Sequence, residues 1–298
     1  LNNQFLLTQG AGASSRGALL SPLSAFTGIH TFISKQQKNS HPMFFQAFHP
    51  AGSPLAHCLF LAPANSLESP ALPDLLDGLT KQIGGRGAFN LVAEVEEEHP
   101  AFTALRQNGF GIFARQRMWK VTQASNSSGA GSWRPVLERD RFGIHLLRKA
   151  LVPGQVQQIE MEHSDTHEGY VFRHDREIVA YAEVRRGPRG IWVLPFIHLD
   201  AEPFDKAIAD LLARLRPRSN RPVYICLRSY QDWLQVALED LNAQAGPRQV
   251  VMARRTSLAV KVEETRRSTV AARNAEPATM QLPEPQAHFS EHSVVNKR

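Results

Sequence analysis

The hydrophobic positions of the first half of the chain alternate between short apolar runs and stretches with a helical period. A helical period marks 69–84, where Ser69 can cap the helix and Pro70 suits its first turn. The apolar positions of this helix are Leu72, Leu75, Leu76 and Leu79. A shorter helix is predicted over 99–109, ended by Gly109. Apolar runs bounded by polar turns predict strands at 29–34, 43–48, 56–63, 88–95 and 110–121.

The second half of the chain repeats this order of elements. A predicted helix over 134–152 opens it, and three strands with two short turns fall within 169–199. The elements expected after them are helix 205–215, strand 221–229, helix 232–244 and a strand or strand pair in 248–262.

Short sequence matches recur between the two halves at nearly constant spacing. Three do so: Asp74 in "DLLDGL" with Asp210 in "DLLARL", Ala104 with Ala237, and Ala114 with Ala253, at separations of 136, 133 and 139 residues. Three matches in one order indicate a duplication, with a period much longer than that of a solenoid repeat. The sequence therefore predicts two similar α/β units, each about half the chain.

Composition divides the chain at the ends of these units. The start is polar and glycine-rich, the stretch after the first unit is small and polar, and the end has no apolar period. The expected segments are a flexible N-terminus at 1–15, a first domain at 16–121, a linker at 122–133, a second domain at 134–262 and a disordered tail at 263–298.

Overall composition is that of a soluble globular protein, with 42% hydrophobic and 21% charged residues. The first residues lack the basic segment and apolar core of a signal peptide, and no apolar run is long enough to span a bilayer. Cys58 and Cys226 each lie inside an apolar run, which favours two buried, reduced thiols. We therefore expect a cytoplasmic protein with no membrane partner.

The net charge of +6 and the pI near 9.6 raise the question of nucleic-acid binding. The basic residues are spread in short pairs, such as Arg185–Arg186 and Arg254–Arg255, without a long basic block. Nucleic-acid binding therefore rests on net charge only, and we expect no nucleic-acid partner. Such binding would show a steep dependence on salt.

Candidate chemical groups gather in two places. The stretch "EMEHSDTHEG" contains Glu160, Glu162, His163, Asp165 and His167, but a loop with Gly169 offers little of the rigidity that a metal site needs, so we expect no metal. His57, Cys58 and Glu94 lie in or at the end of predicted strands. Cys58 is expected in the core, because no activating neighbour is visible. Glu94 is either a base or a solvent-facing strand end.

The segment "AEVEEEHPAFTALRQNGFGIFARQRMWKV", with Gly109–Phe110 between a short helix and a closing strand, resembles the second half of a GNAT (GCN5-related N-acetyltransferase) domain. The segment 170–261 resembles the same fold more loosely, without the Gly-Phe. The resemblance covers most of 44–262 and implies two tandem GNAT-like acyl-CoA N-acyltransferase folds. It also implies acetyl-CoA as co-substrate and a small amine or a protein amine as acceptor.

In that family the start of the central helix binds the CoA pyrophosphate through backbone N–H groups and glycines. The resemblance places these positions at Ser66, Ser69 and Ala71 in the first copy, where both glycines are absent and Pro70 removes a donor. In the second copy they fall at Glu202, Asp205 and Ala207, where two carboxylates would face a polyanion.

Many members of the family also carry a tyrosine as general acid in the short helix. Leu105 and Leu238 stand at that place in the two copies, and neither leucine can donate a proton. Two hypotheses remain at this point. The chain is an acyl-CoA-dependent N-acyltransferase with the first domain active, or it is a catalytically inactive GNAT-like scaffold that binds a small ligand or a protein.

Overall fold

A computed structural model describes residues 2–10, 28–34, 42–121, 133–160, 169–174, 177–201, 203–215 and 221–256. All of these residues belong to one compact unit, Leu1–Ala259. The expected tail at 263–298 and nearly all of the expected linker, 122–132, lie outside the described residues.

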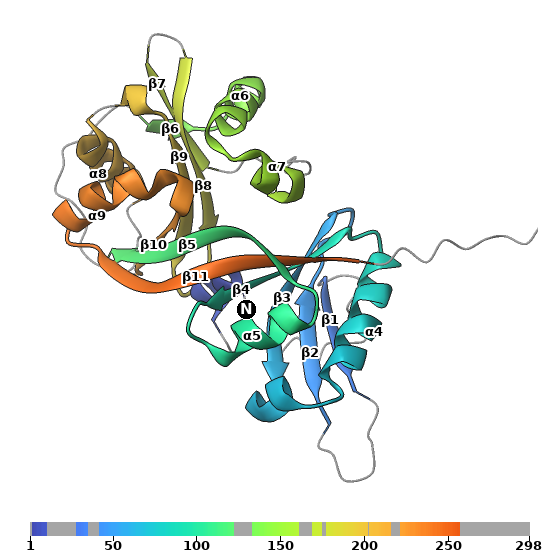
Figure 1. Cartoon of the computed structure of the whole chain (residues 1–298). Helices are drawn as coiled ribbons and strands as arrows, with labels where there is room; N and C mark the ends of the chain where they lie inside the picture. Colours follow the sequence, from blue (N-terminus) through green and yellow to red (C-terminus); the bar gives the residue numbers. More distant parts are fainter. Residues whose placement is uncertain are drawn as a thin grey trace, which may run out of the picture. The chain divides into compact units, whose positions relative to one another are not determined.

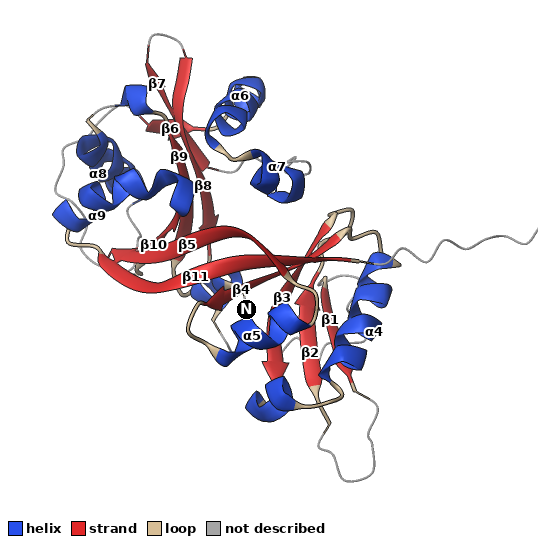
Figure 2. Cartoon of the chain, in the orientation of Figure 1, coloured by secondary structure: helices blue, strands red, loops and turns tan. Residues whose placement is uncertain are grey.

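The described residues form one mixed sheet of 11 strands, in the order β1-β2-β3-β4-β11-β5-β10-β9-β8-β7-β6 (Figures 1 and 2). The strands are β1 (Ile29–Ile33), β2 (Phe44–Phe48), β3 (Leu55–Ala62), β4 (Asn90–Glu96), β5 (Gly111–Val121), β6 (Trp133–Pro135), β7 (Gly169–His174), β8 (Glu177–Arg186), β9 (Ile191–Ile197), β10 (Val223–Arg228) and β11 (Gln244–Arg255). The α/β class and the repeated order of elements are confirmed.

Helices cover both faces of this sheet. They are α1 (Asn3–Gln9), α4 (Leu72–Gly84), α5 (Pro100–Gln107), α6 (Arg141–Leu151), α7 (Gly154–Glu160), α8 (Phe204–Leu215) and α9 (Gln235–Asp240), with short 3-10 turns η2 (Ala64–Glu68), η3 (Glu138–Asp140), η4 (Leu199–Ala201) and η5 (Ser229–Leu234). One core packs α4 and α5 against the strands of the first half, and a second packs α8 and α9 against those of the second half. A third core joins α6 and α7 to the opposite face of the second half (Figure 1).

The last strand of each half lies inside the sheet of the other. β11 stands between β4 and β5 and is antiparallel to both, while β5 pairs with β10. The two halves therefore share a continuous hydrogen-bonded sheet through exchanged strands. Sequence order alone does not reveal this exchange, because each pairing joins strands that are more than one hundred residues apart.

The pairing of β5 with β11 has two-fold symmetry. Gln116 lies directly opposite Gln249, 133 residues further along the chain. Two flanking pairs, Ala245 with Trp119 and Met252 with Ile112, are related by the same offset. Adding 133 to Ile112 gives Ala245, and adding 133 to Trp119 gives Met252. Gln116 and Gln249 are therefore equivalent positions on a local two-fold axis, which supports the duplication.

The pairing of β5 with β11 contradicts one of the three sequence matches between the halves. Ala114 pairs with Val251, and Ala253 pairs with Gly111, so Ala114 and Ala253 are not equivalent positions. The match of Ala114 with Ala253 is wrong because its separation of 139 residues is six longer than the offset of 133 in the structure. At the correct offset the two halves share Arg-Gln, at 115–116 and 248–249. The offset of 133 agrees with the match of Ala104 with Ala237.

Residues 3–9, expected to be flexible, form helix α1 instead. Asn2 caps it by accepting a hydrogen bond from the backbone N–H of Phe5 at 2.8 Å. The C-terminal end of α1 docks on the turn between β8 and β9, where the N–H of Arg189 donates to the carbonyl of Thr8 at 3.0 Å. Because seven residues are too few for a stable isolated helix, these tertiary contacts account for the order.

The second half begins with a strand rather than with the expected helix. Trp133, placed at the end of the expected linker, is buried in β6, and its indole N–H donates to the carbonyl of Ala207 at 2.8 Å. After β6, the buried Asp140 accepts hydrogen bonds from the Arg134 guanidinium at 2.6 and 2.7 Å and from the N–H of Leu137 at 2.9 Å. Helix α6 then starts at Arg141.

Candidate functional site

The start of α4, the first candidate site for the CoA pyrophosphate, uses its own hydrogen-bond donors internally. The N–H of Ser66 donates to the carbonyl of Pro63, and the N–H of Ser69 donates to the carbonyl of Ser66. The next two backbone N–H groups both donate to Ser69. The N–H of Ala71 donates to its Oγ at 3.3 Å, and the N–H of Leu72 donates to its carbonyl at 3.0 Å.

The remaining positions at this helix start offer little more. Pro70 and Pro73 carry no N–H, and the hydroxyl of Ser66 is buried without a hydrogen-bond partner among the described residues. The helix begins at Leu72 with Ala71 as its N-cap, not with Ser69 as expected. Ser69 instead caps the end of the 3-10 turn η2. The residues at this place do not fit a pyrophosphate, which needs several free backbone donors.

The equivalent place in the second half fits no better. Glu202 lies outside the described residues, and the carboxylate of Asp205 is exposed in the first turn of α8. Ala207 is buried and its carbonyl is bonded to the Trp133 indole. An anion at this helix start would face Asp205 directly.

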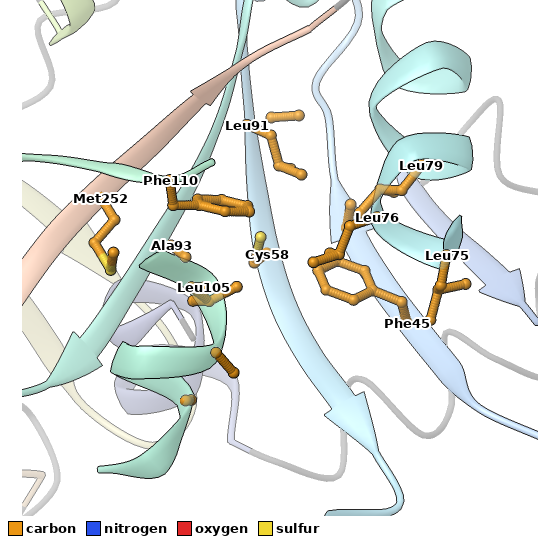
Figure 3. Close-up of a cluster of buried hydrophobic side chains, with 14 of the residues drawn as sticks. Phe45, Cys58, Leu75, Leu76, Leu79, Leu91, Ala93, Leu105, Phe110 and Met252 are labelled. Atoms are coloured by element: carbon orange, nitrogen blue, oxygen red, sulfur yellow. The ribbon is translucent and has the colours of Figure 1, made fainter. Parts of the chain in front are cut away.

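The space between α4 and α5 is filled by hydrophobic side chains. Figure 3 shows Cys58, Phe110 and Leu105 between the two helices, beside Leu76 of α4. Leu105 and its equivalent Leu238 are both buried core residues, so neither reaches a cleft on this side of the sheet.

His57 and Cys58 are adjacent on β3 and point to opposite faces of the sheet. Cys58 belongs to the core beneath α4 and α5, and burial raises the pKa of its thiol to about 12. His57 lines a cavity on the other face. Burial lowers the pKa of His57, and Glu94 acts in the opposite direction. Cys58 is therefore a core residue, as expected, and the accessible chemistry lies on the face of His57.

This cavity has a volume of about 900 Å³, within the range of small-molecule sites. It is bounded by α1, by the exchanged strand β11 and by elements of both halves. Its charged and titratable lining residues are His57, Glu94, Arg148, Glu160, Glu183, Arg185, Arg186 and Arg228. It lies where β3 and β4 part, since these parallel strands pair only over Leu55–His57 and Asn90–Val92.

Two arginines of this cavity are almost completely buried. Arg228 at the end of β10 forms an ion pair with Glu160 at the end of α7, and 6% of its surface is exposed. Burial lowers the pKa of Arg228, but Glu160 and other nearby groups raise it above its usual value. Arg228 therefore stays charged.

Arg148 on α6 has no such carboxylate. It is 6% exposed, and its guanidinium lies 5.1 Å from the ring centroid of Phe196. Among the described residues it makes no ion pair and no side-chain hydrogen bond, and its Nε is buried without a partner. Nε and Nη1 of Arg228 are likewise without partners in the described part of the chain.

Glu94 is held in place by the N-terminal helix. Its Oε2 accepts hydrogen bonds from the backbone N–H and the Nδ2 of Asn3, both at 2.8 Å. Asn3 Nδ2 also donates to Gln249 Oε1 at 2.7 Å, and Gln116 Nε2 donates to the same oxygen at 3.1 Å. Cys226 Sγ donates to Gln116 Oε1 at 3.3 Å, so a polar chain connects Glu94 to the two-fold axis. Glu94 is part of this interior network and not a solvent-facing strand end.

No protein-family model and no curated protein matches the sequence. The chain is similar in structure to a GCN5-related N-acetyltransferase from Kribbella flavida, at 14% identity over 82% of this chain and 95% of that chain, with a TM-score of 0.49. It is also similar to a GCN5-related N-acetyltransferase from Sphaerobacter thermophilus, at 10% identity over 72% of this chain and 76% of that chain, with a TM-score of 0.46. A third similar structure is a tandem GNAT protein from the clavulanic acid biosynthesis pathway, at 12% identity over 77% of this chain and 84% of that chain, with a TM-score of 0.43.

The two arginines were missed in the sequence because Arg148 stands in an amphipathic helix and Arg228 at the end of an apolar strand. Arg148 follows Ile144 by four positions on the buried face of α6, and Arg228 ends the strand "VYICLR". A charged residue at a position that the apolar period assigns to the interior was the available signal. Glu160, interpreted as part of a solvated loop, instead ends α7 and pairs with Arg228.

The remaining members of the acidic and histidine-rich stretch, Glu162, His163, Asp165 and His167, lie outside the described residues. Within the described residues, no group of three or more His, Cys, Asp or Glu side chains is placed to hold a metal ion. No helix in that same part of the chain is long and apolar enough to cross a membrane.

Proposed function

We propose that this chain binds a small polar molecule in the cavity beside β3, β4 and β10. The observation that carries the proposal is Arg148, a buried guanidinium that lines the cavity without a carboxylate partner among the described residues. A buried charge without a partner is costly, so a site of this kind is suited to a ligand that supplies one.

The state of the helix starts supports binding over acyl transfer from acetyl-CoA. The N–H groups around Ser69 bond within their own turn, and apolar side chains fill the space between α4 and α5. A fold alone does not establish an activity, so the residues at the site decide. In this account the chain is a GNAT-like scaffold without acyltransferase activity.

N-acyl transfer by the first half is the second candidate, and one observation favours it. His57 and Glu94 line the cavity where β3 and β4 separate, and Glu94 influences the pKa of His57. A small amine or a protein amine in the cavity would therefore meet two groups able to accept a proton. This candidate requires acetyl-CoA to bind near Ser66, Ser69 and Ala71.

Thermal unfolding of three proteins separates the two candidates. The wild type is screened against amino acids, dicarboxylates, sugar phosphates, polyamines and acetyl-CoA, beside Leu55→Trp, which adds bulk at the cavity wall, and Ser69→Glu, which adds charge at the start of α4. A ligand at one hundred times its Kd raises the stability of its protein by about 2.7 kcal/mol.

The proposal expects compounds that stabilise the wild type and Ser69→Glu but not Leu55→Trp. Stabilisation by acetyl-CoA that survives Leu55→Trp and disappears in Ser69→Glu would overturn it in favour of acyl transfer. If no compound of any class raises the unfolding temperature of the wild type, the binding function is wrong as well.

A further inference from the structure

Arg148 is the buried guanidinium near Glu160 that forms no ion pair with any carboxylate among the described residues. Arg228 and Arg148 both act on this carboxylate: burial raises the pKa of Glu160, and the two guanidinium groups lower it. Among the residues that the structure describes, Glu160 forms an ion pair with Arg228. Glu94 and Glu183 line the same cavity and act on Glu160 as well, so the feature to explain is Arg148, which forms an ion pair with none of these three carboxylates.

The other charged groups of the cavity are already engaged. Glu183 forms an ion pair with Arg185 at 3.2 Å, and Glu94 accepts its hydrogen bonds from Asn3. Arg186 donates to the hydroxyl of Tyr170 at 3.1 Å. None of these contacts supplies a negative charge to Arg148.

The geometry points to an oxyanion group on the ligand, a carboxylate or a phosphate, bound by the guanidinium of Arg148, with the positive charge of Arg228 in the wall of the same cavity. This inference rests on the proposed function and gives the chemical class of its ligand. A guanidinium presents its N–H donors in a plane that matches the oxygen atoms of both anions, and such charge-assisted hydrogen bonds are strong in a site shielded from water.

Each of the two arginines is held by a contact at the cavity wall. The guanidinium carbon of Arg148 lies 5.1 Å from the centroid of the Phe196 ring, a cation–π contact that holds the charged group beside this ring. Glu160 holds Arg228 through Nη2 and leaves Nε and Nη1 without partners in the described part of the chain. The arginines come from α6 and β10, two elements of the second half, while Glu94 and His57 face the cavity from the first half.

The test compares the wild type with Arg148→Met, which keeps an unbranched side chain and removes the guanidinium with its charge. Both proteins are titrated by calorimetry with inorganic phosphate in one arm and with succinate in the other, at constant ionic strength. The exposed Arg115, whose guanidinium pairs with Glu97 outside the cavity, provides the matched control Arg115→Met.

We expect the wild type and Arg115→Met to bind at least one of the two anions with the same Kd. Loss of a buried charged partner costs about 2 kcal/mol or more, so Arg148→Met should weaken that binding by about 30-fold or more. Arg148→Lys should recover part of the affinity, because it restores the charge without the planar donors. Preference for phosphate or for succinate identifies the kind of oxyanion.

A second measurement holds even without a bound ligand. Because an unpaired buried charge is replaced by an apolar side chain of similar volume, Arg148→Met should raise the unfolding temperature of the ligand-free protein. Arg148→Gln, which removes the charge but keeps a polar group, is the second variant for this comparison. A lowered unfolding temperature in both variants would contradict an uncompensated charge at Arg148.

The outcomes also separate this inference from the function on which it rests. If neutral or cationic compounds stabilise the wild type but not Leu55→Trp, while phosphate and succinate do not bind, the cavity binds ligands and the oxyanion inference is wrong. If neither anion binds and no other compound depends on Leu55, both are wrong. Equal anion binding by the wild type and Arg148→Met would also overturn the inference.

Discussion

Gln116 and Gln249 face one another across β5 and β11, and the Nε2 of Gln116 donates to the Oε1 of Gln249 at 3.1 Å. They are equivalent residues of the two halves, so one hydrogen bond lies on the axis of the duplication. The same Oε1 accepts from Asn3, which holds Glu94 at the cavity. The axis thus joins the exchanged strands to the N-terminal helix and to the proposed binding site.

Replacement of Gln249 should destabilise the protein and loosen α1. In Gln249→Leu the buried Nε2 of Gln116 loses its acceptor, and one unsatisfied buried group costs about 1–3 kcal/mol. The Nδ2 of Asn3 loses its bond to Gln249 and keeps its bond to Glu94. Urea unfolding should show a loss in that range. In a double-mutant cycle with Asn3→Ala the two losses should not add, since the residues share a hydrogen bond. Fully additive losses would show that the chain of hydrogen bonds does not act as a unit.

Substitution of Gly187 should detach α1 from the turn between β8 and β9. A Cβ at this position would lie 2.2 Å from the carbonyl oxygen of Thr8, which is too close for any residue except glycine. Gly187→Ala should speed amide hydrogen exchange in 3–9 while the exchange of β8 stays slow. Gly154→Ala, where a Cβ meets nothing within 4 Å, is the control and should leave α1 unchanged.

Asp140 should make stability depend on pH in the acid range. The hydrogen bonds from Arg134 lower its pKa to about 2 against the opposing effect of burial. Its unfolded pKa is about 3.9, so its stabilising contribution is present above pH 4 and is lost as the pH falls towards 2. Asp140→Asn should cost about 2 kcal/mol at pH 7 and flatten the acid dependence of unfolding. An unchanged acid dependence in this variant would argue against the ion pair.

Both cysteines should be inert in the native protein. Burial raises the pKa of Cys58 to about 12 and raises that of Cys226 above its usual range, so neither thiol forms a thiolate at neutral pH. A colorimetric thiol reagent at pH 8 should therefore react only after denaturant is added. Rapid labelling of Cys58 in the native state would contradict this prediction, because it would show that the reagent reaches the core beneath α4 and α5.

The sequence was sufficient for the elements that recur in both halves and for their order, but not for α1, β6 and α7. The apolar spacing of Leu72, Leu75, Leu76 and Leu79 predicted α4, and all four leucines are buried. The exchange of β5 and β11 was not predictable, because local apolar patterns carry no information about which distant strand is the partner. Helix α1 was missed for a related reason, since its order depends on contacts with Glu94 and Gly187 far along the chain.

The site was only partly accessible to sequence reasoning. His57 and Glu94 were singled out, and both line the cavity. The expected CoA positions Ser66, Ser69 and Ala71 followed from the family resemblance, which assigns places but not the direction of hydrogen bonds. Arg148 was missed because its neighbours in α6 read as an ordinary amphipathic helix, and only the folded chain shows that its charge is buried.

Hydrogen–deuterium exchange with and without ligand tests the central claim most directly, namely that the function resides in the cavity and not at the helix starts. Wild-type protein is compared alone, with saturating phosphate or succinate, and with acetyl-CoA. The account predicts slower exchange in α6, α7 and the end of β10 with the anion, and no change at 63–75 in any sample. Protection of 63–75 by acetyl-CoA, with no effect around Arg148 and Arg228, would contradict it.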